Sequence, residues 1–257
     1  MRKKIVGFMI AGVLVLVLGF ISTPARAEIN LGLGGYYYAP GFGEINDTLG
    51  DVNDYYGTDL EFKGGGMYGL WVGWDITPRF GLRAEYDSFR SETSGTGDHL
   101  DINYWYSDYW RDYYLWYYET LETKITLTIT PIIFSGIYRF PPFFVGGGMC
   151  LIPTKAEASG ILTEDYYYDY YDYWYGEWYG PYWLEGYSYD LTESDSDSPI
   201  GPVVLGGVEL VGGENKGVFL NVEVRYISAE ANLSVDGVDT KVDLSGFQAG
   251  VSGGFEF

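Results

Sequence analysis

After residue 27, several segments of the chain alternate apolar side chains with polar or small ones at a period of two. The clearest run is the last, in which Phe247, Ala249, Val251, Gly253, Phe255 and Phe257 alternate with Gln248, Gly250, Ser252, Gly254 and Glu256. This period is typical of a strand with one apolar face. No apolar run after residue 27 is long enough for a membrane-spanning helix. If the chain enters a membrane, it must therefore cross it as strands.

The first 27 residues have the composition of a secretory signal peptide. Arg2, Lys3 and Lys4 precede an apolar run over residues 5–21, and Ala25-Arg26-Ala27 resembles a signal peptidase site. We expect cleavage before Glu28, export from the cytoplasm, and a single domain over residues 28–257. A retained membrane anchor is the alternative.

Eight segments show the alternation, and they define the expected fold. They cover about residues 28–38, 63–76, 80–90, 123–138, 143–159, 200–211, 218–226 and 240–257, with a bulge expected at Pro131. The connections alternate between long ones (about 41–62, 91–122 and 160–199) and short ones, and Asp236-Gly237 forms a hairpin turn. This arrangement predicts an all-β fold: a closed eight-stranded antiparallel transmembrane β-barrel with long external loops.

Charged side chains fall opposite the apolar face of the predicted strands. An eight-stranded barrel holds little more than its own side chains, so charges in its lumen must pair with one another. The expected lumen set comprises Asp75, Arg83, Glu85, Lys124, Glu209, Glu223 and Arg225. A soluble lipocalin-like barrel is the alternative, but it would place this charged face in water.

Three segments resemble a known family, namely the small outer-membrane barrels similar to OmpA, OmpX and OmpW. They are DITPRFGLRAEY (75–86), FFVGGGMCL (143–151) and GFQAGVSGGFEF (246–257). The resemblance extends over residues 28–257 and implies insertion into the outer membrane, with Phe255 and Phe257 presented to the barrel assembly machinery. OmpA carries a peptidoglycan-binding domain after its barrel. No such domain follows here, so a cell-wall anchoring role is not expected.

Two tracts within the predicted loops are rich in tyrosine, tryptophan and acidic residues. They span residues 104–119 and 164–190 and are expected outside the cell. Tyr and Trp offer a large, rigid contact area with a polar tip, which favours recognition of a glycan, a peptide or another cell. The alternative is that they extend the barrel above the membrane and stack across strands. The candidate recognition residues are Tyr104, Trp105, Trp110, Trp116, Tyr170, Trp174, Trp178 and Trp183.

The sequence contains few other candidates for metal-binding or catalytic residues. Glu193, Asp195 and Asp197 are weak candidates for Ca²⁺ ligands, but their spacing lacks the glycine and closing glutamate of an EF-hand, so a solvated acidic turn is expected. His99 is the only histidine and is expected in a loop, whereas Cys150 is expected to face lipid or its neighbours within a strand. No catalytic site, cofactor or metal site is predicted.

The net charge of the chain restricts the kinds of molecule that it is expected to bind. The formal net charge is −21 for the whole chain and becomes more negative once the basic signal is removed, so binding to nucleic acid is not expected. The expected partners are outer-membrane lipid, the assembly machinery and an external ligand; the sequence gives no oligomeric state. We expect a non-enzymatic outer-membrane barrel with a role in surface interaction or structural integrity. A narrow pore for small or apolar solutes and a lipid-modifying enzyme are the alternatives.

Overall fold

The computed structural model describes residues 28–257 except 108–110, 212–216 and 236–237. Side chains are described for the same residues other than those of 102–112, 211–216 and 235–239. The expected signal peptide and the Asp236-Gly237 turn lie outside the described residues. The α-helix in this part of the chain is not long and apolar enough to cross a membrane.

Eight strands form the barrel. They are β1 (Glu28–Pro40), β2 (Gly65–Thr77), β3 (Phe80–Ser107), β5 (Ile132–Phe140), β6 (Phe143–Leu151), β9 (Ile200–Val211), β10 (Val218–Ile227) and β13 (Gly246–Glu256). Each pairs antiparallel with its neighbours around the ring, and β1 pairs with β13 to close it. Asn30 of β1 lies opposite Glu256, so both ends of the described chain are at the same end of the barrel. The fold is a closed eight-stranded antiparallel transmembrane β-barrel.

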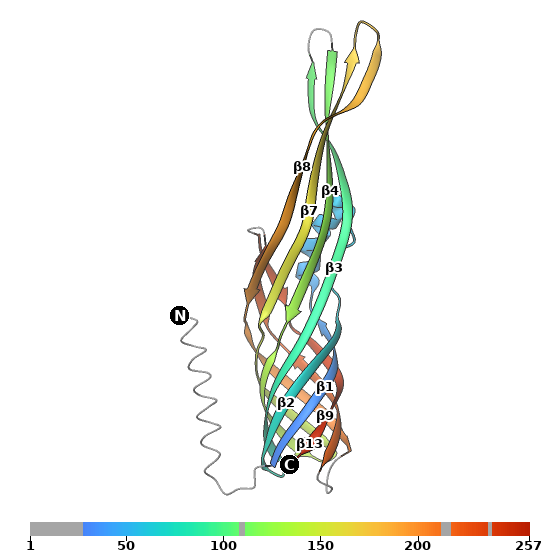
Figure 1. The fold of residues 1–257 in the computed structure, drawn as a ribbon. Helices are drawn as coiled ribbons and strands as arrows, with labels where there is room; N and C mark the ends of the chain where they lie inside the picture. The colour runs from blue at the N-terminus through green and yellow to red at the C-terminus, as the bar shows by residue number, and fades with distance from the viewer. Residues whose placement is uncertain (1–27, 108–110, 212–216, 236–237) are drawn as a thin grey trace.

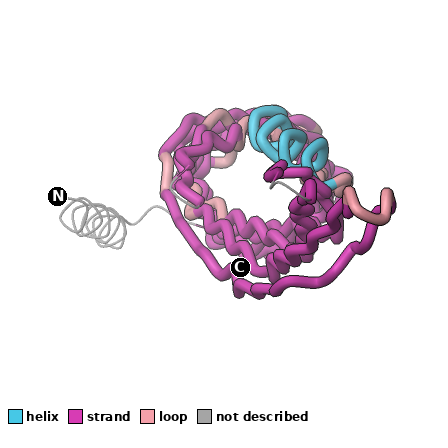
Figure 2. Tube along the Cα trace, turned by 90° about the horizontal axis from the view of Figure 1, so that it is seen from above, coloured by secondary structure: helices cyan, strands magenta, loops and turns pink. Residues whose placement is uncertain are grey.

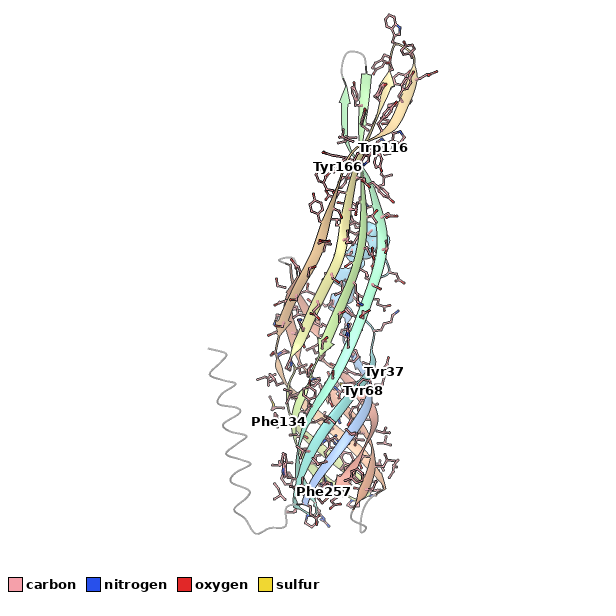
Figure 3. The ribbon with its side chains drawn as sticks, in the orientation of Figure 1. Tyr37, Tyr68, Trp116, Phe134, Tyr166 and Phe257 are labelled. Atoms are coloured by element: carbon pink, nitrogen blue, oxygen red, sulfur yellow. The ribbon has the colours of Figure 1, made fainter. Side chains whose placement is uncertain are left out.

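The outer surface of the barrel is apolar. In β1 the side chains of Ile29, Leu31 and Leu33 are exposed, as are Phe247, Val251 and Phe255 in β13. Figure 3 shows Tyr37, Tyr68, Phe134 and Phe257 on the outside of the barrel. Since the alternating partners Gln248 and Ser252 are fully buried, the lumen takes the polar side chains. This inside-out distribution is that of a barrel surrounded by lipid, and the predicted faces of the first and last strands are confirmed.

Most strands continue beyond the barrel through an irregular step at one level. The steps lie between β5 and β4 (Arg111–Ile129), β6 and β7 (Thr154–Asp172), β9 and β8 (Glu177–Asp197), β10 and β11 (Glu230–Val235), and β13 and β12 (Val238–Asp243). Pro131, Pro153 and Pro199 occupy three of these steps. Because proline has no N–H to donate to a ladder, it belongs at such interruptions. The carbonyls of all three prolines still accept backbone hydrogen bonds, from Asp87, Thr130 and Ile152 respectively.

Above the step, four strands form a long twisted sheet, which we call the blade. It consists of the upper part of β3 from Phe89, followed by β4, β7 and β8, in that order. In Figure 1 the blade rises well beyond the rest of the barrel wall. The two aromatic tracts therefore lie mainly on strands. Residues 91–122 and 160–199, expected as long loops, are thus mostly strands in the described part of the chain, and the barrel wall extends through them as the alternative expected.

The connection between β1 and β2 contains helix α2 (Gly43–Tyr56), where the sequence analysis placed only a loop. Ile45, Leu49 and Val52 recur at helical spacing and pack against the core. Gly57 ends the helix in the left-handed region (φ 70°), and its N–H donates to the carbonyl of Asn53. The helix lies over part of the barrel rim (Figure 2).

Two asparagines hold the return segment after α2 against the helix. Asn46 accepts a hydrogen bond from the N–H of Phe62 (2.8 Å) and donates one to its carbonyl (3.0 Å). Asn53 does the same with Leu60, at 2.7 and 2.9 Å. Each amide thus substitutes for a neighbouring strand and satisfies backbone groups that would otherwise be buried unpaired.

An apolar core fills the barrel at and above the step. Its fully or almost fully buried members include Tyr38, Phe89, Leu127, Ile129, Ile133, Cys150, Ile152, Ile227 and Leu244. The expected inward position of Lys124 implies that Leu127 and Ile129, on the other face of the same strand, point outward; both are buried in this core, so that expectation is wrong. Above the lipid there is no apolar solvent outside, so the apolar row turns inward as in a soluble protein.

Candidate functional site

A network of charged side chains bridges the middle of the lumen. Arg83 of β3 contacts Glu223 of β10 across the barrel (2.8 Å) and Glu85 on its own strand (3.0 Å). Arg225 contacts Glu85 (2.7 Å), Glu223 (3.0 Å) and Asp87 (3.2 Å). All five side chains are at most 3% exposed. Two guanidinium groups thus face three carboxyl groups, and side chains from opposite walls meet across the lumen.

Tyr36 lies at the centre of this network. Its hydroxyl accepts hydrogen bonds from Arg83 (3.3 Å) and Arg225, and the Arg225 guanidinium lies 3.9 Å from the centroid of its ring. On the other side of the network, Ser252 donates to Glu223. A second aromatic ring, that of Trp71, stacks under Arg83 at 4.2 Å. Each guanidinium group is thus held by carboxylates and by the face of one aromatic ring.

The sequence analysis found four of these charges and missed the residues that organise them. Arg83, Glu85, Glu223 and Arg225 are brought together, and Asp87, Tyr36 and Ser252 join them from positions on the same inward rows. The signal for all three was the alternation itself: Asp87 lies two positions from Glu85, Ser252 is on the polar row of the last strand, and Tyr36 is on the row of Asn30 in the first.

Lys124 and Glu209 do not belong to this network. Lys124 lies on β4 above the step, about half exposed, and pairs with Glu92 at 2.7 Å on the blade. Its expected place in the lumen is wrong, because the strand has left the barrel at this height. Glu209 lies lower, where it lines a cavity of about 30 Å³ together with Arg83 and Arg139. Asp75 pairs with Arg139 at the same end of the lumen.

The blade carries a repeated pairing between tyrosine and glutamate. A tyrosine hydroxyl donates to a glutamate two residues away on the same face of a strand, from Tyr117 to Glu119, Tyr166 to Glu164, Tyr179 to Glu177 and Tyr187 to Glu185. The pairs recur on β4, β7 and β8 because a period of two returns each side chain to the same face. The phenols donate without bringing a positive charge, so the carboxylates keep their full negative charge.

Rings stack across the blade between neighbouring strands. Tyr170 stacks on Tyr179 (centroids 5.4 Å apart) and on Tyr182 (6.1 Å), and Tyr117 packs on Tyr166 at 5.0 Å. Cross-strand aromatic pairs of this kind stabilise a sheet that has solvent on both faces. Figure 3 shows Trp116 and Tyr166 together where the strands cross.

The tryptophans of the blade do not form one cluster, and each has its own environment. Trp116 donates to Asp169 (3.0 Å) and Trp183 to Asp165 (3.4 Å), whereas Trp178 packs on Tyr171 and Tyr114. Trp174 lies in the turn between β7 and β8 and is 77% exposed. Of the remaining candidates, the backbones of Tyr104 and Trp105 are in β3 but their side chains lie outside the described residues, as does all of Trp110.

Helix α2 meets the blade at a group of aromatic residues around Glu119. The ring of Tyr55 stacks on His99 of β3 with centroids 3.8 Å apart, and Nδ1 of His99 is 2.9 Å from the Tyr55 carbonyl. Burial and the nearby Glu119 carboxylate raise the pKa of Tyr56 to about 12. Burial and hydrogen bonds with Glu119 and Glu164 likewise raise the pKa of Tyr117. His99 is thus a packed strand residue, and its expected place in a loop is wrong.

The acidic residues near the end of β8 contact backbone. Asp195 accepts a hydrogen bond from the N–H of Ser234 (2.6 Å) and Asp197 from that of Asn232 (3.0 Å), both on β11. The two backbone donors nearest to Asp195, on Ser234 and Ser196, lower its pKa. Glu193 lies on the same strand and alternates with them. Among the described residues there is no group of three or more His, Cys, Asp or Glu that could hold a metal ion.

Cys150 is buried in the apolar core, so the alternative that it faces lipid is wrong. It is the only cysteine of the chain. Phe255 and Phe257, the expected assembly signal, lie exposed on the outer surface at the end of the barrel that carries the termini. The N–H of Phe257 donates to the carbonyl of Ile29 (3.0 Å), which fixes the end of the chain to β1.

The fold and the filled lumen define a small transmembrane β-barrel with an extension above the membrane. No family model and no curated protein matches the sequence. Solved structures with a similar outline include Ail of Yersinia pestis in complex with the heparin analogue sucrose octasulfate, at 9% identity and a TM-score of 0.40, covering 90% of this chain and 99% of that one. The outer membrane protein AlkL in lipid bilayers gives 11% identity, a TM-score of 0.40 and 90% coverage of both chains. Neisserial surface protein A is 11% identical with a TM-score of 0.36, and the match covers 90% of this chain and 97% of that one.

Proposed function

We propose that this protein is an exported outer-membrane barrel that recognises a ligand outside the cell through its blade. The barrel is the anchor, its apolar surface contacts outer-membrane lipid, and Phe255 and Phe257 are the signal for the assembly machinery. Cleavage of residues 1–27 precedes insertion. The blade then stands on the external side, because the short turns and both termini of the barrel lie at the opposite end.

One observation carries the proposal: the blade exposes large aromatic side chains far above the apolar band of the barrel. Trp174, Trp178 and Trp183 are 77%, 53% and 63% exposed. Exposed aromatic groups of this size mark interaction surfaces on soluble structures. The stacked tyrosines beneath them hold the surface rigid, which lowers the entropy lost on binding.

The lumen supports a surface role over the pore alternative. The network around Arg225 connects β3 with β10 and β13 across the barrel, and the apolar core lies above it. A solute would have to displace paired buried charges, which is costly. The enzymatic alternative lacks support from His99 and Cys150, because the first is stacked on Tyr55 and the second is buried.

Removal of the blade tests the proposal. Residues 96–122 and 161–190 are each replaced by an Asn-Gly turn, since Gly95 lies opposite Thr123 and Gly160 opposite Leu191. Heat-modifiable migration on gels verifies that the barrel still closes. Binding of cells that display each form to glycan arrays, immobilised peptides and other cells is then compared. We expect binding to be lost with the blade; equal binding by both forms would refute the proposal.

A further inference from the structure

The upper part of the blade contains an apolar pocket of about 300 Å³. It is lined by Tyr113, Tyr114, Leu115, Tyr168 and Leu184, which come from β4, β7 and β8. Further rings pack behind its walls, since Tyr168 packs on Tyr182 (5.4 Å) and Tyr114 on Trp178 (5.2 Å), both in tilted geometry. The volume lies at the lower end of the range for small-molecule sites and suits one large apolar group.

Two carboxylates lie beside this apolar pocket, and the hydrogen bonds described for them come from neutral donors. Asp169 follows Tyr168 in the chain and lies opposite Tyr114, and Glu185 follows Leu184. Asp169 accepts from the Trp116 indole and Glu185 from the Tyr187 hydroxyl, and neither donor neutralises a negative charge. No lysine or arginine occurs between Lys155 and Lys216.

The excess of negative charge extends over the whole blade. Residues 89–107, 111–129 and 154–197 contain 17 acidic and 4 basic residues. A field of this sign attracts cationic ligands and repels anionic ones such as sulfated sugars. Tyrosine ring faces add attraction for ammonium and guanidinium groups.

We infer that the pocket binds a basic peptide segment by an apolar side chain, while flanking lysines or arginines of the peptide contact Asp169 and Glu185. The apolar group enters between Leu115 and Leu184, and the cations remain at the acidic rim and over the tyrosine rings. This inference rests on the proposed recognition function of the blade and names its ligand class.

A defined peptide tests the inference on the full chain in detergent micelles. The probe is a nine-residue peptide of alternating Lys and Phe, and binding is followed by calorimetry. We expect saturable binding that weakens about tenfold or more between low and high salt, as exposed charges become screened. Peptides with Glu in place of Lys, or Ser in place of Phe, are expected not to bind; equal binding by either would overturn the inference.

Variants on one strand localise the site. Leu184→Ser and Glu185→Gln are each expected to weaken binding about fivefold to tenfold. Leu191→Ser and Glu193→Gln, farther along β8, are the matched controls and are expected to leave it unchanged. An equal loss in site and control variants, or no loss in either, would overturn the inference. If neutral glycans bind the blade and the basic peptide does not, the ligand class is wrong but the recognition function stands; if the blade deletion leaves cell binding intact, the proposed function itself fails.

Discussion

The lumen and the blade both place tyrosine beside carboxylates, but they differ in the cations that accompany the pair. In the lumen, the Tyr36 hydroxyl donates to Glu85 (3.3 Å) and accepts from two arginines, whose guanidinium groups pair with the carboxylates around it. On the blade, tyrosines donate to glutamates, and no ion pair to these glutamates forms among the side chains that the structure describes. The first arrangement pairs its charges within the lumen and joins opposite walls of the barrel. The second leaves negative charge and aromatic surface available to a partner.

The largest loss in the free energy of unfolding is expected from Arg225→Met in the lumen. The change leaves Glu85, Asp87 and Glu223 buried with a single arginine, and an uncompensated buried charge costs about 3–5 kcal/mol. Denaturant titration of the folded barrel in micelles, followed by heat-modifiable gel migration, measures the loss. Lys124→Met, on the exposed blade, is the control and is expected to change the free energy of unfolding by less than about 0.5 kcal/mol. Equal effects of the two changes would remove the distinction between the regions.

Removal of one hydroxyl in each region gives a direct comparison. Tyr36→Phe takes an acceptor from two buried guanidinium groups and is expected to cost about 1–3 kcal/mol. Tyr117→Phe removes a donor to the buried Glu119, which keeps the neighbouring phenols of Tyr55 and Tyr56, and about 0.5–1 kcal/mol is expected. Denaturant titration reports the first change and hydrogen exchange of β4 amides the second. A larger loss for Tyr117→Phe would reverse the comparison.

The blade is expected to weaken in alkali. The folded protein raises the pKa of Tyr56 to about 12 from its ordinary value near 10, so it favours the neutral phenol. This stabilisation is fully present below about pH 10 and is lost as the pH rises through about 12. Tyrosinate absorbance of wild type minus Tyr56→Phe follows the titration. In Glu119→Gln the pKa of Tyr56 is expected to move back toward 10; an unchanged midpoint would show that burial alone sets it.

The smallest effect concerns the contact between β8 and β11. The pKa of Asp195 is lowered by backbone donors, so its contribution is present above its ordinary pKa of about 3.8 and disappears as the pH falls through the lower folded value. Asp195→Ala is expected to speed exchange of the Ser234 amide at neutral pH, while Glu193→Ala is not. Equal exchange rates in Asp195→Ala and wild type would contradict the assigned contact.

The barrel could be predicted from the sequence, because a strand between lipid and lumen must alternate apolar and polar side chains. The outward rows of β1 and β13 and four charges of the lumen network were predicted from this pattern. The upper part of the blade was not predicted, because it lies above the apolar core and Tyr or Trp suits either of its faces. Residues 111–122 therefore show no separate apolar and polar rows. Lys124 was misplaced since its strand was assumed to stay within the barrel on both sides of Pro131.

Helix α2 was missed for a different reason. Its sequence, rich in Gly, Asn and Asp, has the composition of a loop. Its helical state depends on contacts distant in the chain, through Leu49 in the core and through Asn46 and Asn53 against the return segment. Tertiary contacts of this kind override local propensity and leave little trace in the sequence.

The step marked by Pro131, Pro153 and Pro199 is where the molecule changes solvent. Below the step the outer surface is apolar and faces lipid, while the lumen is polar. Above the step the outer surface faces water, and the interior is apolar. Sliding the barrel along the membrane normal in either direction would set one of these halves in the wrong medium. The step therefore fixes the depth of the barrel in the membrane, and with it the height of the tip of the blade above the lipid.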